Sequence, residues 1–191
     1  MLNIGVGDGF LDRQAKAAGW RIESVDPDAH AIARLVADGI TGHVAGIERL
    51  PQANGSMDVV VATEVLEHLN DEQLSAGVSE IARVLKPGGL FIGTVPHAEN
   101  LLEQQAVCPR CNEVFHRWGH QRSLTIDDVR ALLAPGFAVE RIGRTAFVDL
   151  RRGMRGFAKG MLRILLAKLG SPIAVPTIWW VARKIMGPSR S

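Results

Sequence analysis

Three glycines near the start of the sequence lie where a bound cofactor could approach the backbone. Gly5, Gly7 and Gly9 fall between an apolar run, Met1 to Val6, and a helical pattern, Phe10 to Gly19. A glycine has no Cβ, so a ligand can come close to the chain, and the following helix start presents free N–H groups. The pattern predicts a ligand site at this turn, although glycine turns also serve packing.

A carboxylate follows this turn at a spacing that suits a ribose. Asp26 lies 19 positions after Gly7, at the end of a predicted strand. An acid at this place accepts the ribose hydroxyls of an adenosine in doubly wound sheets. The dinucleotide fingerprint needs glycine where this sequence has Phe10, and no Gly-Lys-Ser/Thr follows the turn, so dinucleotides and ATP are disfavoured. The residues favour a cofactor that carries adenosine but no phosphate.

Two cysteines and two histidines form a second group that could do chemistry. Cys108 and Cys111 stand in a Cys-Pro-x-Cys knuckle, and His116 and His120 follow one helical turn apart. Two thiolates and two imidazoles are a set that closes a tetrahedral zinc site. We predict a structural zinc knuckle at residues 108–120. The alternative is a pair of free thiols with a His120 that faces the substrate.

A third group follows a buried strand pattern. Glu64, Glu67 and His68 come directly after Met57 to Ala62, which is apolar on both faces as a central parallel strand should be. A base placed there could reach the ligand pocket. The alternative is that these residues form a solvated helix start, and the sequence assigns no catalytic residue.

The elements that must position these groups alternate between strand and helix. A regular alternation of this kind predicts a doubly wound α/β sheet with helices on both faces. The helix before Lys86 is indicated by apolar residues at intervals of four, three and four, and the later helix begins at Thr125, with Asp128 three residues on. The predicted strands are 1–6, 21–26, 42–45, 57–62, 90–95, 138–142 and 178–182, and the predicted helices are 10–19, 29–37, 74–85 and 125–133.

Length and composition fit one soluble domain. The chain has 191 residues, of which 47% are hydrophobic, so it can bury a sizeable core. We expect no secretion leader and no transmembrane anchor, since no apolar run reaches the roughly 18–20 residues that a spanning helix needs. With two cysteines there is no disulfide framework, which favours a reducing compartment and a cytoplasmic location.

The charge is distributed unevenly. Residues 1–149 carry all 20 acidic residues against 13 basic ones, whereas residues 150–191 carry nine basic residues and no acid. An amphipathic basic insertion is predicted at about 149–176. Its cationic helix, residues 151–169, fits a peripheral membrane contact or lipid-linked substrate, a lid over the substrate, or plain packing. These basic residues include no aromatic stacking platform, so nucleic acid is a disfavoured partner.

Taken together and in order, several of these segments resemble the class I S-adenosylmethionine (SAM)-dependent methyltransferases. The resemblance is greatest to the branch that includes ubiquinone-biosynthesis and small-molecule methyltransferases, and it covers roughly residues 1–148 and the final strand. The segments that carry it are Leu2 to Gly9, Val25-Asp26, Leu50-Pro51, Met57 to Leu69 and Arg83 to Leu90.

The resemblance implies a Rossmann-like, mostly parallel sheet with an antiparallel last strand, formed by a single domain over residues 1–191. It implies SAM as the cofactor, with Gly5, Gly7 and Gly9 along the methionine and ribose and Asp26 on the ribose hydroxyls. Residues flanking the adenine and the methionine would then be Gly46, Ile47, Glu48 and Thr63. Core packing is the alternative for Ile47.

The sequence departs from the family at three places. Asn3 stands where an acid usually helps to hold the cofactor's amino group, and Gly46 where an acid often meets the adenine amine. The chain also begins at its first strand, so the usual helical cover of the substrate pocket lies before Met1 or comes from elsewhere. We therefore expect a SAM-dependent methyltransferase of a small-molecule or lipid-linked acceptor, and as the alternative a catalytically silent SAM-fold binding or scaffold module.

Overall fold

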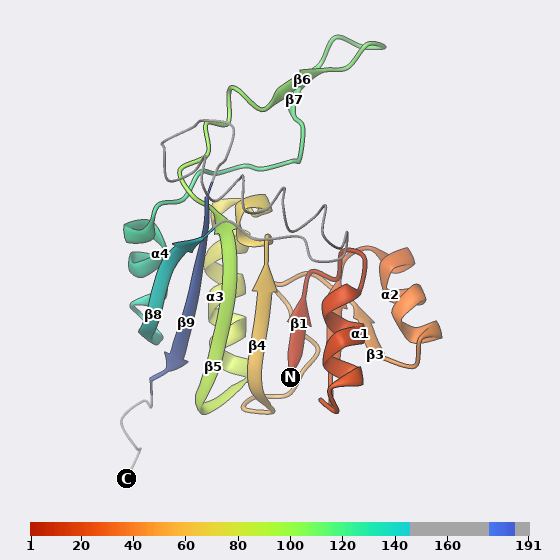
Figure 1. The fold of residues 1–191 in the computed structure, drawn as a ribbon, viewed down its shortest axis with the longest axis vertical. Coiled ribbons are helices and arrows are strands. Elements are labelled where there is room, and N and C mark those ends of the chain that lie inside the picture. The colour runs from red at the N-terminus through yellow and green to blue at the C-terminus, as the bar shows by residue number, and fades with distance from the viewer. Residues whose placement is uncertain (146–175, 186–191) are drawn as a thin grey trace, which may run out of the picture.

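The computed structural model describes residues 1–145 and 176–185. Within them a seven-stranded sheet has the order β3-β2-β1-β4-β5-β9-β8 (Figure 1). Neighbouring strands from β3 to β5 run parallel. The strands are β1 (Leu2–Ile4), β2 (Glu23–Asp26), β3 (Thr41–Val44), β4 (Met57–Thr63), β5 (Leu85–Pro96), β8 (Phe137–Thr145) and β9 (Thr177–Lys184).

Helices cover both faces of this sheet, as the sequence predicted. Buried residues of α1 and α2 share one apolar cluster, while those of α3 and α4 belong to another. In Figure 1, α1 lies in front of the sheet and α3 behind it. The helices are α1 (Phe10–Ala17), α2 (Ala29–Ala37), α3 (Asp71–Val84), α4 (Ile126–Leu133) and the short 3-10 helix η1 (Leu66–His68).

The two helices that begin near the cavities described below have strong start signals. Asn70 and Gln73 form a capping box at α3, and Thr125 and Asp128 form one at α4. A capping box satisfies backbone N–H groups that a helix start leaves without partners. The start at Thr125 was predicted from the sequence, whereas the start of α3 at Asp71 lies three residues before the predicted one at Leu74.

The strand that comes last in the described chain runs antiparallel to both of its neighbours. β9 is inserted between β5 and β8, and Gly93 of β5 lies opposite Trp180 of β9. Trp180 is fully buried and fills the space beside Gly93, where a Cβ would come within 2.1 Å of the ring. The expected antiparallel last strand is confirmed.

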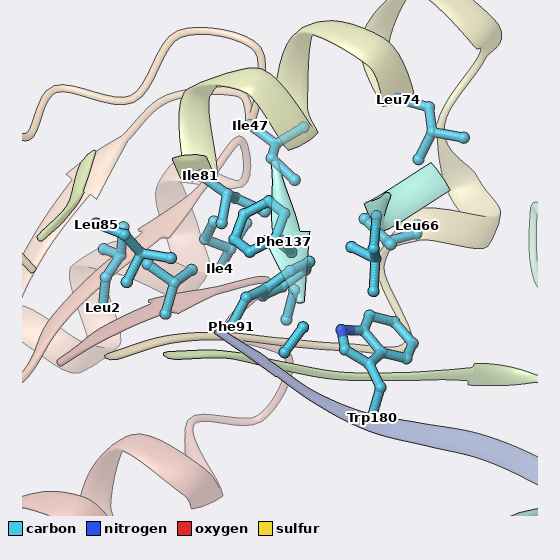
Figure 2. Close-up of a cluster of buried hydrophobic side chains, with 14 of the residues drawn as sticks. Leu2, Ile4, Ile47, Leu66, Leu74, Ile81, Leu85, Phe91, Phe137 and Trp180 are labelled. Atoms are coloured by element: carbon cyan, nitrogen blue, oxygen red, sulfur yellow. The ribbon is translucent and has the colours of Figure 1, made fainter. Parts of the chain in front are cut away.

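The larger core lies between the central strands and α3. Leu2 and Ile4 of β1 face this core with Ile81 of α3 and Phe91 of β5 (Figure 2). Since neighbouring side chains of a strand point to opposite faces, Asn3 turns toward the α1 side. The alternation in β1 thus places one polar side chain next to the glycine turn.

A small hairpin extends beyond the carboxyl ends of the parallel strands. It consists of β6 (Gln105–Val107) and β7 (Val114–His116) in a separate two-stranded sheet (Figure 1). These strands were not predicted, because each is three residues long and too short for a period-two pattern to be recognised.

Two further findings bear on the sequence predictions. Lys86 to Gly89 were expected to form a break between a helix and the strand that begins at Leu90. These residues instead belong to β5, which begins at Leu85 directly after α3. No helix among the described residues is long and apolar enough to cross a membrane. The basic insertion predicted at about 149–176, including the amphipathic helix at 151–169, lies outside the described residues except for Pro176.

Candidate functional site

The glycine turn forms one wall of a cavity of about 590 Å³ at the carboxyl ends of β1 and β4. Gly5 and Gly7 line it, with φ angles of 80° and 55° that side chains rarely adopt. Gly9 does not line the cavity. It begins α1 with φ 73°, and a Cβ there would come within 2.7 Å of Leu35. Gly9 therefore packs between α1 and α2, and its expected cofactor contact stays a prediction.

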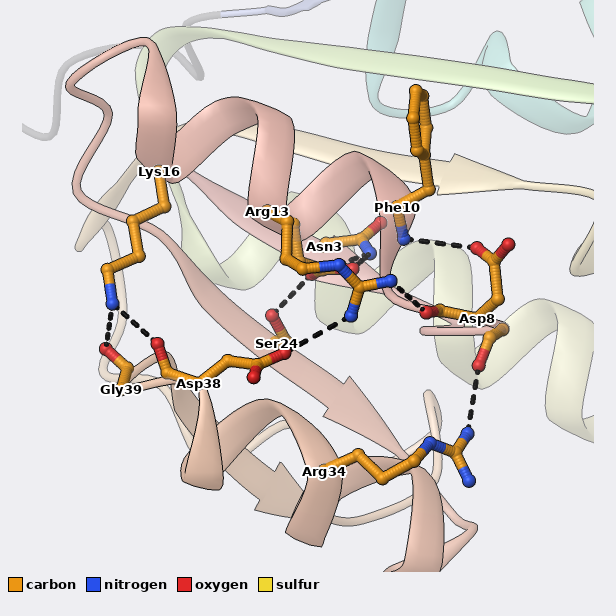
Figure 3. A network of polar contacts seen from close by, with 11 residues as sticks. Asn3, Asp8, Phe10, Arg13, Lys16, Ser24, Arg34, Asp38 and Gly39 are labelled. Carbon is orange, nitrogen blue, oxygen red and sulfur yellow. Dashed lines mark hydrogen bonds and ion pairs between the residues drawn. The ribbon is translucent and has the colours of Figure 1, made fainter. Parts of the chain in front are cut away.

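Two arginines hold the outer side of the turn (Figure 3). Arg13 donates to the carbonyl oxygen of Asp8 at 2.6 Å, and Arg34 donates to that of Gly7 at 3.3 Å. The Asp8 carboxylate accepts the backbone N–H of Phe10 at 3.0 Å. These contacts hold the loop from outside and leave its inner edge along the cavity.

Asp26 lies at the end of β2 on the cavity wall. Its Oδ2 accepts the backbone N–H of Val6 at 2.7 Å, and its Oδ1 accepts that of Asp28 at 2.8 Å. A carboxylate has about four acceptor positions, so each oxygen keeps one for a further donor. The structure brings Asp26 together with the glycine turn, and the backbone fixes its orientation.

Asn3 belongs to a buried polar network beneath the turn. Its amide nitrogen donates to the carboxylate of Asp12 at 2.9 and 3.1 Å, and the Ser24 hydroxyl donates to the same carboxylate at 2.6 Å. The Asn3 carbonyl oxygen, Oδ1, is buried without a hydrogen-bond partner in the part of the chain described. Asn3 is also among the residues that line the cavity.

The residues expected around the adenine and methionine line the same cavity. Ile47 is buried and packs against Gly77 of α3, so it serves both the core and the cavity wall. The Glu48 carboxylate occupies the space beside Gly46, where a Cβ would come within 2.3 Å of Oε1. Gly46 therefore allows the Glu48 side chain to fold back, and Thr63 ends β4 on the facing wall.

A second cavity of about 380 Å³ adjoins the first. Glu64 and His68 line both cavities, while Glu99, Trp118 and His120 line the second. Glu64 has a φ of 55°, and its Oε1 accepts the Thr94 hydroxyl at 2.9 Å. Strained backbone of this kind is concentrated at functional sites. Burial raises the pKa of Glu64, and burial together with His120 lowers that of His68.

Glu67 points into the protein and not into solvent. It is 1% exposed, and neither carboxylate oxygen has a hydrogen-bond partner among the described residues. Burial raises the pKa of Glu67 to about 8. The alternative that this segment is a solvated helix start is wrong for Glu67.

The four residues of the predicted zinc knuckle do not form one cluster. His116 and His120 stack at 4.7 Å between ring centroids, and both face Glu99. Cys108 and Cys111 lie at the hairpin end and are not among the clustered metal-ligand atoms found in the described residues. The arrangement pairs the histidines with a carboxylate, and zinc binding by the cysteines stays a prediction.

Comparison with known proteins relates the first half of the chain to one protein family. A family model described as a methyltransferase domain matches residues 2–93. A SAM-dependent methyltransferase from Methanosarcina mazei has a similar fold, with a TM-score of 0.71 and 17% identity, over 97% of this chain and 92% of that one. The matched domain and the named relatives confirm the resemblance to the class I SAM-dependent methyltransferases, and the solved structure confirms the fold.

Curated methyltransferases match this chain over only part of their own length. A dimethylglycine N-methyltransferase of Parasynechococcus marenigrum is 27% identical over 65% of this chain and 51% of its own. A ubiquinone biosynthesis O-methyltransferase of Bradyrhizobium sp. is 36% identical over 48% of this chain and 38% of its own. The chain thus spans about half or less of the length of these relatives.

One acidic residue of this site, Glu99, was not singled out from the sequence. Glu99 lies three residues beyond β5 and is paired with His120, 21 positions later. No periodic pattern links residues that far apart, so only the folded chain brings them together. Glu67, by contrast, was among the predicted candidates, because it follows a central strand directly and so lies at the edge where such sheets bind ligands.

Proposed function

We propose that this chain binds SAM in the larger cavity and transfers its methyl group to a small-molecule acceptor in the adjoining one. The observation that carries the proposal is the pairing of a backbone-oriented Asp26 with a glycine turn on one cavity wall. The two cavities share Glu64 and His68. A donor in one and an acceptor in the other would therefore meet at these residues.

The larger cavity offers a partner for each end of the cofactor. The remaining acceptor positions of Asp26 suit the ribose hydroxyls. For the amino group, Asn3 offers a buried carbonyl oxygen, Oδ1, that has no hydrogen-bond partner among the described residues. Ile47 provides an apolar surface for the adenine, with Gly46 and Glu48 beside it. Asn3 thus supplies a neutral acceptor where relatives of the family usually have an acid.

The residues around the second cavity fit a polar acceptor. SAM supplies an activated methyl group, whose transfer is an in-line displacement that depends on placement of the two reactants. His120 and Glu64 offer polar groups along this cavity, and Trp118 offers an exposed aromatic face. The names of the curated relatives also refer to small acceptors, such as dimethylglycine.

Calorimetric titration with SAM, S-adenosylhomocysteine and NAD tests cofactor choice. We expect binding of the first two and none of NAD. Asp26→Ala should weaken S-adenosylhomocysteine binding by about 1–3 kcal/mol, because charge-assisted hydrogen bonds are lost. Asp127→Ala, on exposed α4 surface away from both cavities, is the matched control. Unchanged affinity in Asp26→Ala would contradict the assigned role.

Turnover separates this proposal from its alternative. Transfer of a labelled methyl group from SAM to members of an acceptor panel of small amines and phenols would support the enzyme. Binding of SAM without transfer to any acceptor would favour the catalytically silent binding module.

A further inference from the structure

The starting point is a buried carboxylate that lacks a partner. Glu67 is 1% exposed, and both of its oxygens are without hydrogen bonds in the described structure. A buried carboxylate is costly unless it is paired with a counter-charge or coordinates a metal. Two imidazoles, those of His68 and His120, lie beside it and meet edge to face at 4.8 Å.

These three side chains have the spacing of a metal site. Glu67, His68 and His120 each offer one ligand atom, and these atoms all lie within 4.8 Å of one another. Ligand atoms about 2.0–2.1 Å from one tetrahedral zinc ion are separated by roughly 3.4 Å, so small side-chain adjustments would close the set. Catalytic sites commonly use three such protein ligands and keep one position open.

A second group, Glu99, His116 and His120, is equally compact, but Nδ1 of its His120 already pairs with Glu99, and Nε2 of its His116 is buried without a hydrogen-bond partner in the described structure. Nδ1 of His116 accepts the backbone N–H of His120 at 3.0 Å, so the proton of this imidazole lies on Nε2. That Nε2 faces Oε1 of Glu99 at 3.7 Å. His116 therefore presents a proton and not a lone pair.

Glu99 in turn fixes the orientation of His120. Its Oε2 lies 2.5 Å from Nδ1 of His120, and its side chain is 8% exposed. A proton on Nδ1 that is shared with Glu99 leaves the lone pair of Nε2 free. Histidine ligands of metals usually donate their other ring N–H to a carboxylate in this way.

We propose that Glu67, His68 and His120 bind a divalent transition-metal ion, with Glu99 and His116 as positioning residues behind His120. Two imidazoles and one carboxylate favour ions such as Zn²⁺, Mn²⁺ or Co²⁺ over Mg²⁺. This set differs from the knuckle predicted from the sequence, since it contains neither Cys108 nor Cys111 and only one of that knuckle's histidines.

The place of the site gives the ion a role. His68 lines both cavities and His120 lines the smaller one, so the ion would lie where the cofactor and acceptor cavities meet. Its open position would hold an oxygen or nitrogen of the acceptor. This role rests on the proposed function, whereas binding of the ion itself does not.

Titration of chelator-stripped full-length protein with Zn²⁺, Mn²⁺ and Co²⁺, followed by metal analysis, tests the site. We expect one equivalent of at least one of these ions to bind. Glu67→Gln should weaken that binding by about 100-fold or more, and Glu99→Gln by about 10–100-fold, as expected for a residue that acts through a ligand. His30→Gln, on the exposed surface of α2, should bind as the wild type does. Absence of binding, or equal binding by wild type and Glu67→Gln, would overturn the proposal.

Two further measurements separate the explanations. Co²⁺ bound by nitrogen and oxygen ligands lacks the intense sulfur-to-metal charge-transfer band. If this band is present, and if Cys108→Ser/Cys111→Ser loses metal binding, the ion is bound by the cysteines and the proposal is refuted. Melting curves and S-adenosylhomocysteine affinity of Glu67→Gln show whether the variant is folded. Metal binding by a protein that fails to bind S-adenosylhomocysteine would refute the proposed function and leave the metal site standing.

Discussion

At the scale of single residues, Gly5 and Gly7 show two different reasons for glycine in one turn. Both have positive φ, but a Cβ on Gly5 would lie 2.4 Å from Cγ2 of Val65, whereas a Cβ on Gly7 would meet nothing within 4 Å. Gly7 is thus required by backbone conformation alone. Gly5 is required by conformation and by the close approach of the chain that follows β4.

This difference predicts unequal costs of substitution. Gly7→Ala should lower the free energy of unfolding by about 1–2 kcal/mol, the cost of a left-handed residue. Gly5→Ala should lower it by about 1–3 kcal/mol more, since Val65 must move. Urea unfolding of both variants measures the difference. If the urea unfolding curves of the two variants have equal midpoints and slopes, Val65 moves aside without a cost in stability.

The buried carboxyl of Glu67 predicts a pH dependence in metal-free protein. Burial raises its pKa from 4.5 to about 8, so the folded protein holds this proton more tightly than the unfolded chain. Its contribution to stability is complete below pH 4.5 and is lost as the pH rises through about 8.

We expect Glu67→Gln to remove this loss. The difference between the two proteins in unfolding free energy should grow by a few kcal/mol over that range, since one pKa unit corresponds to about 1.4 kcal/mol. Denaturant unfolding at several pH values with chelator present measures it. A parallel decline of wild type and variant would contradict the assignment.

Much of the cofactor side of the site could be predicted from sequence. Gly5, Gly7 and Asp26 lie at strand ends, and the carboxyl ends of parallel strands meet at one edge of the sheet. Gly9 does not line the cavity, because it packs against Leu35 of another helix, and sequence spacing does not report such packing. The Glu99 pairing escaped prediction for the same physical reason.

At the scale of elements, β9 pairs with both of its neighbours, β5 and β8, through glycines that lie opposite tryptophans. Gly93 lies opposite the buried Trp180, and Gly143 of β8 lies opposite Trp179 on the other side of β9. A Cβ would come within 2.1 Å of the Trp180 ring but 3.2 Å from that of Trp179. The two pairs form a matched comparison within one strand.

Gly93→Ala should therefore destabilise the protein more than Gly143→Ala. Overpacking of a core costs about 1–3 kcal/mol, and the fully buried Trp180 has no space into which to turn. We expect Gly143→Ala to cost less than about 1 kcal/mol, because Trp179 needs to shift by only a few tenths of an ångström. Thermal melting compares the two variants. An equal decrease in melting temperature would show that the close contact between Gly93 and Trp180 does not set the cost of the substitution.

Long elements with periodic patterns were predicted well, and short ones were not. α2 has the predicted bounds, Ala29–Ala37, and α3 contains Leu74, Val78 and Ile81 of the predicted apolar stripe, although Leu85 begins β5. The hairpin strands β6 and β7 are held by three backbone pairs and by turns at the hairpin end. Nothing in three residues of sequence distinguishes such a strand from a loop.

At the scale of the whole molecule, cofactor binding should be coupled to stability. The larger cavity is formed by β1, β2 and β4 together with residues that lead into α1 and α3. A ligand that binds only the folded state at 100 times its dissociation constant adds about 2.7 kcal/mol to unfolding free energy.

We expect S-adenosylhomocysteine at that concentration to raise the melting temperature by about 5–11 °C for a domain of this size. The same concentration of NAD should leave it unchanged. Asp26→Ala should show a smaller rise at equal ligand concentration. A rise of the same size with NAD would indicate a site that does not select against phosphates.

The insertion of β9 between β5 and β8 has a consequence for how the protein is made. On the ribosome β5 and β8 are synthesised before Thr177–Lys184, yet each pairs with that strand and not with the other. The native partner of the β5 edge is therefore absent from the nascent chain until translation has passed these residues. Exposed strand edges invite pairing with other chains. This stage of biogenesis is where a chaperone would be of most use to the protein.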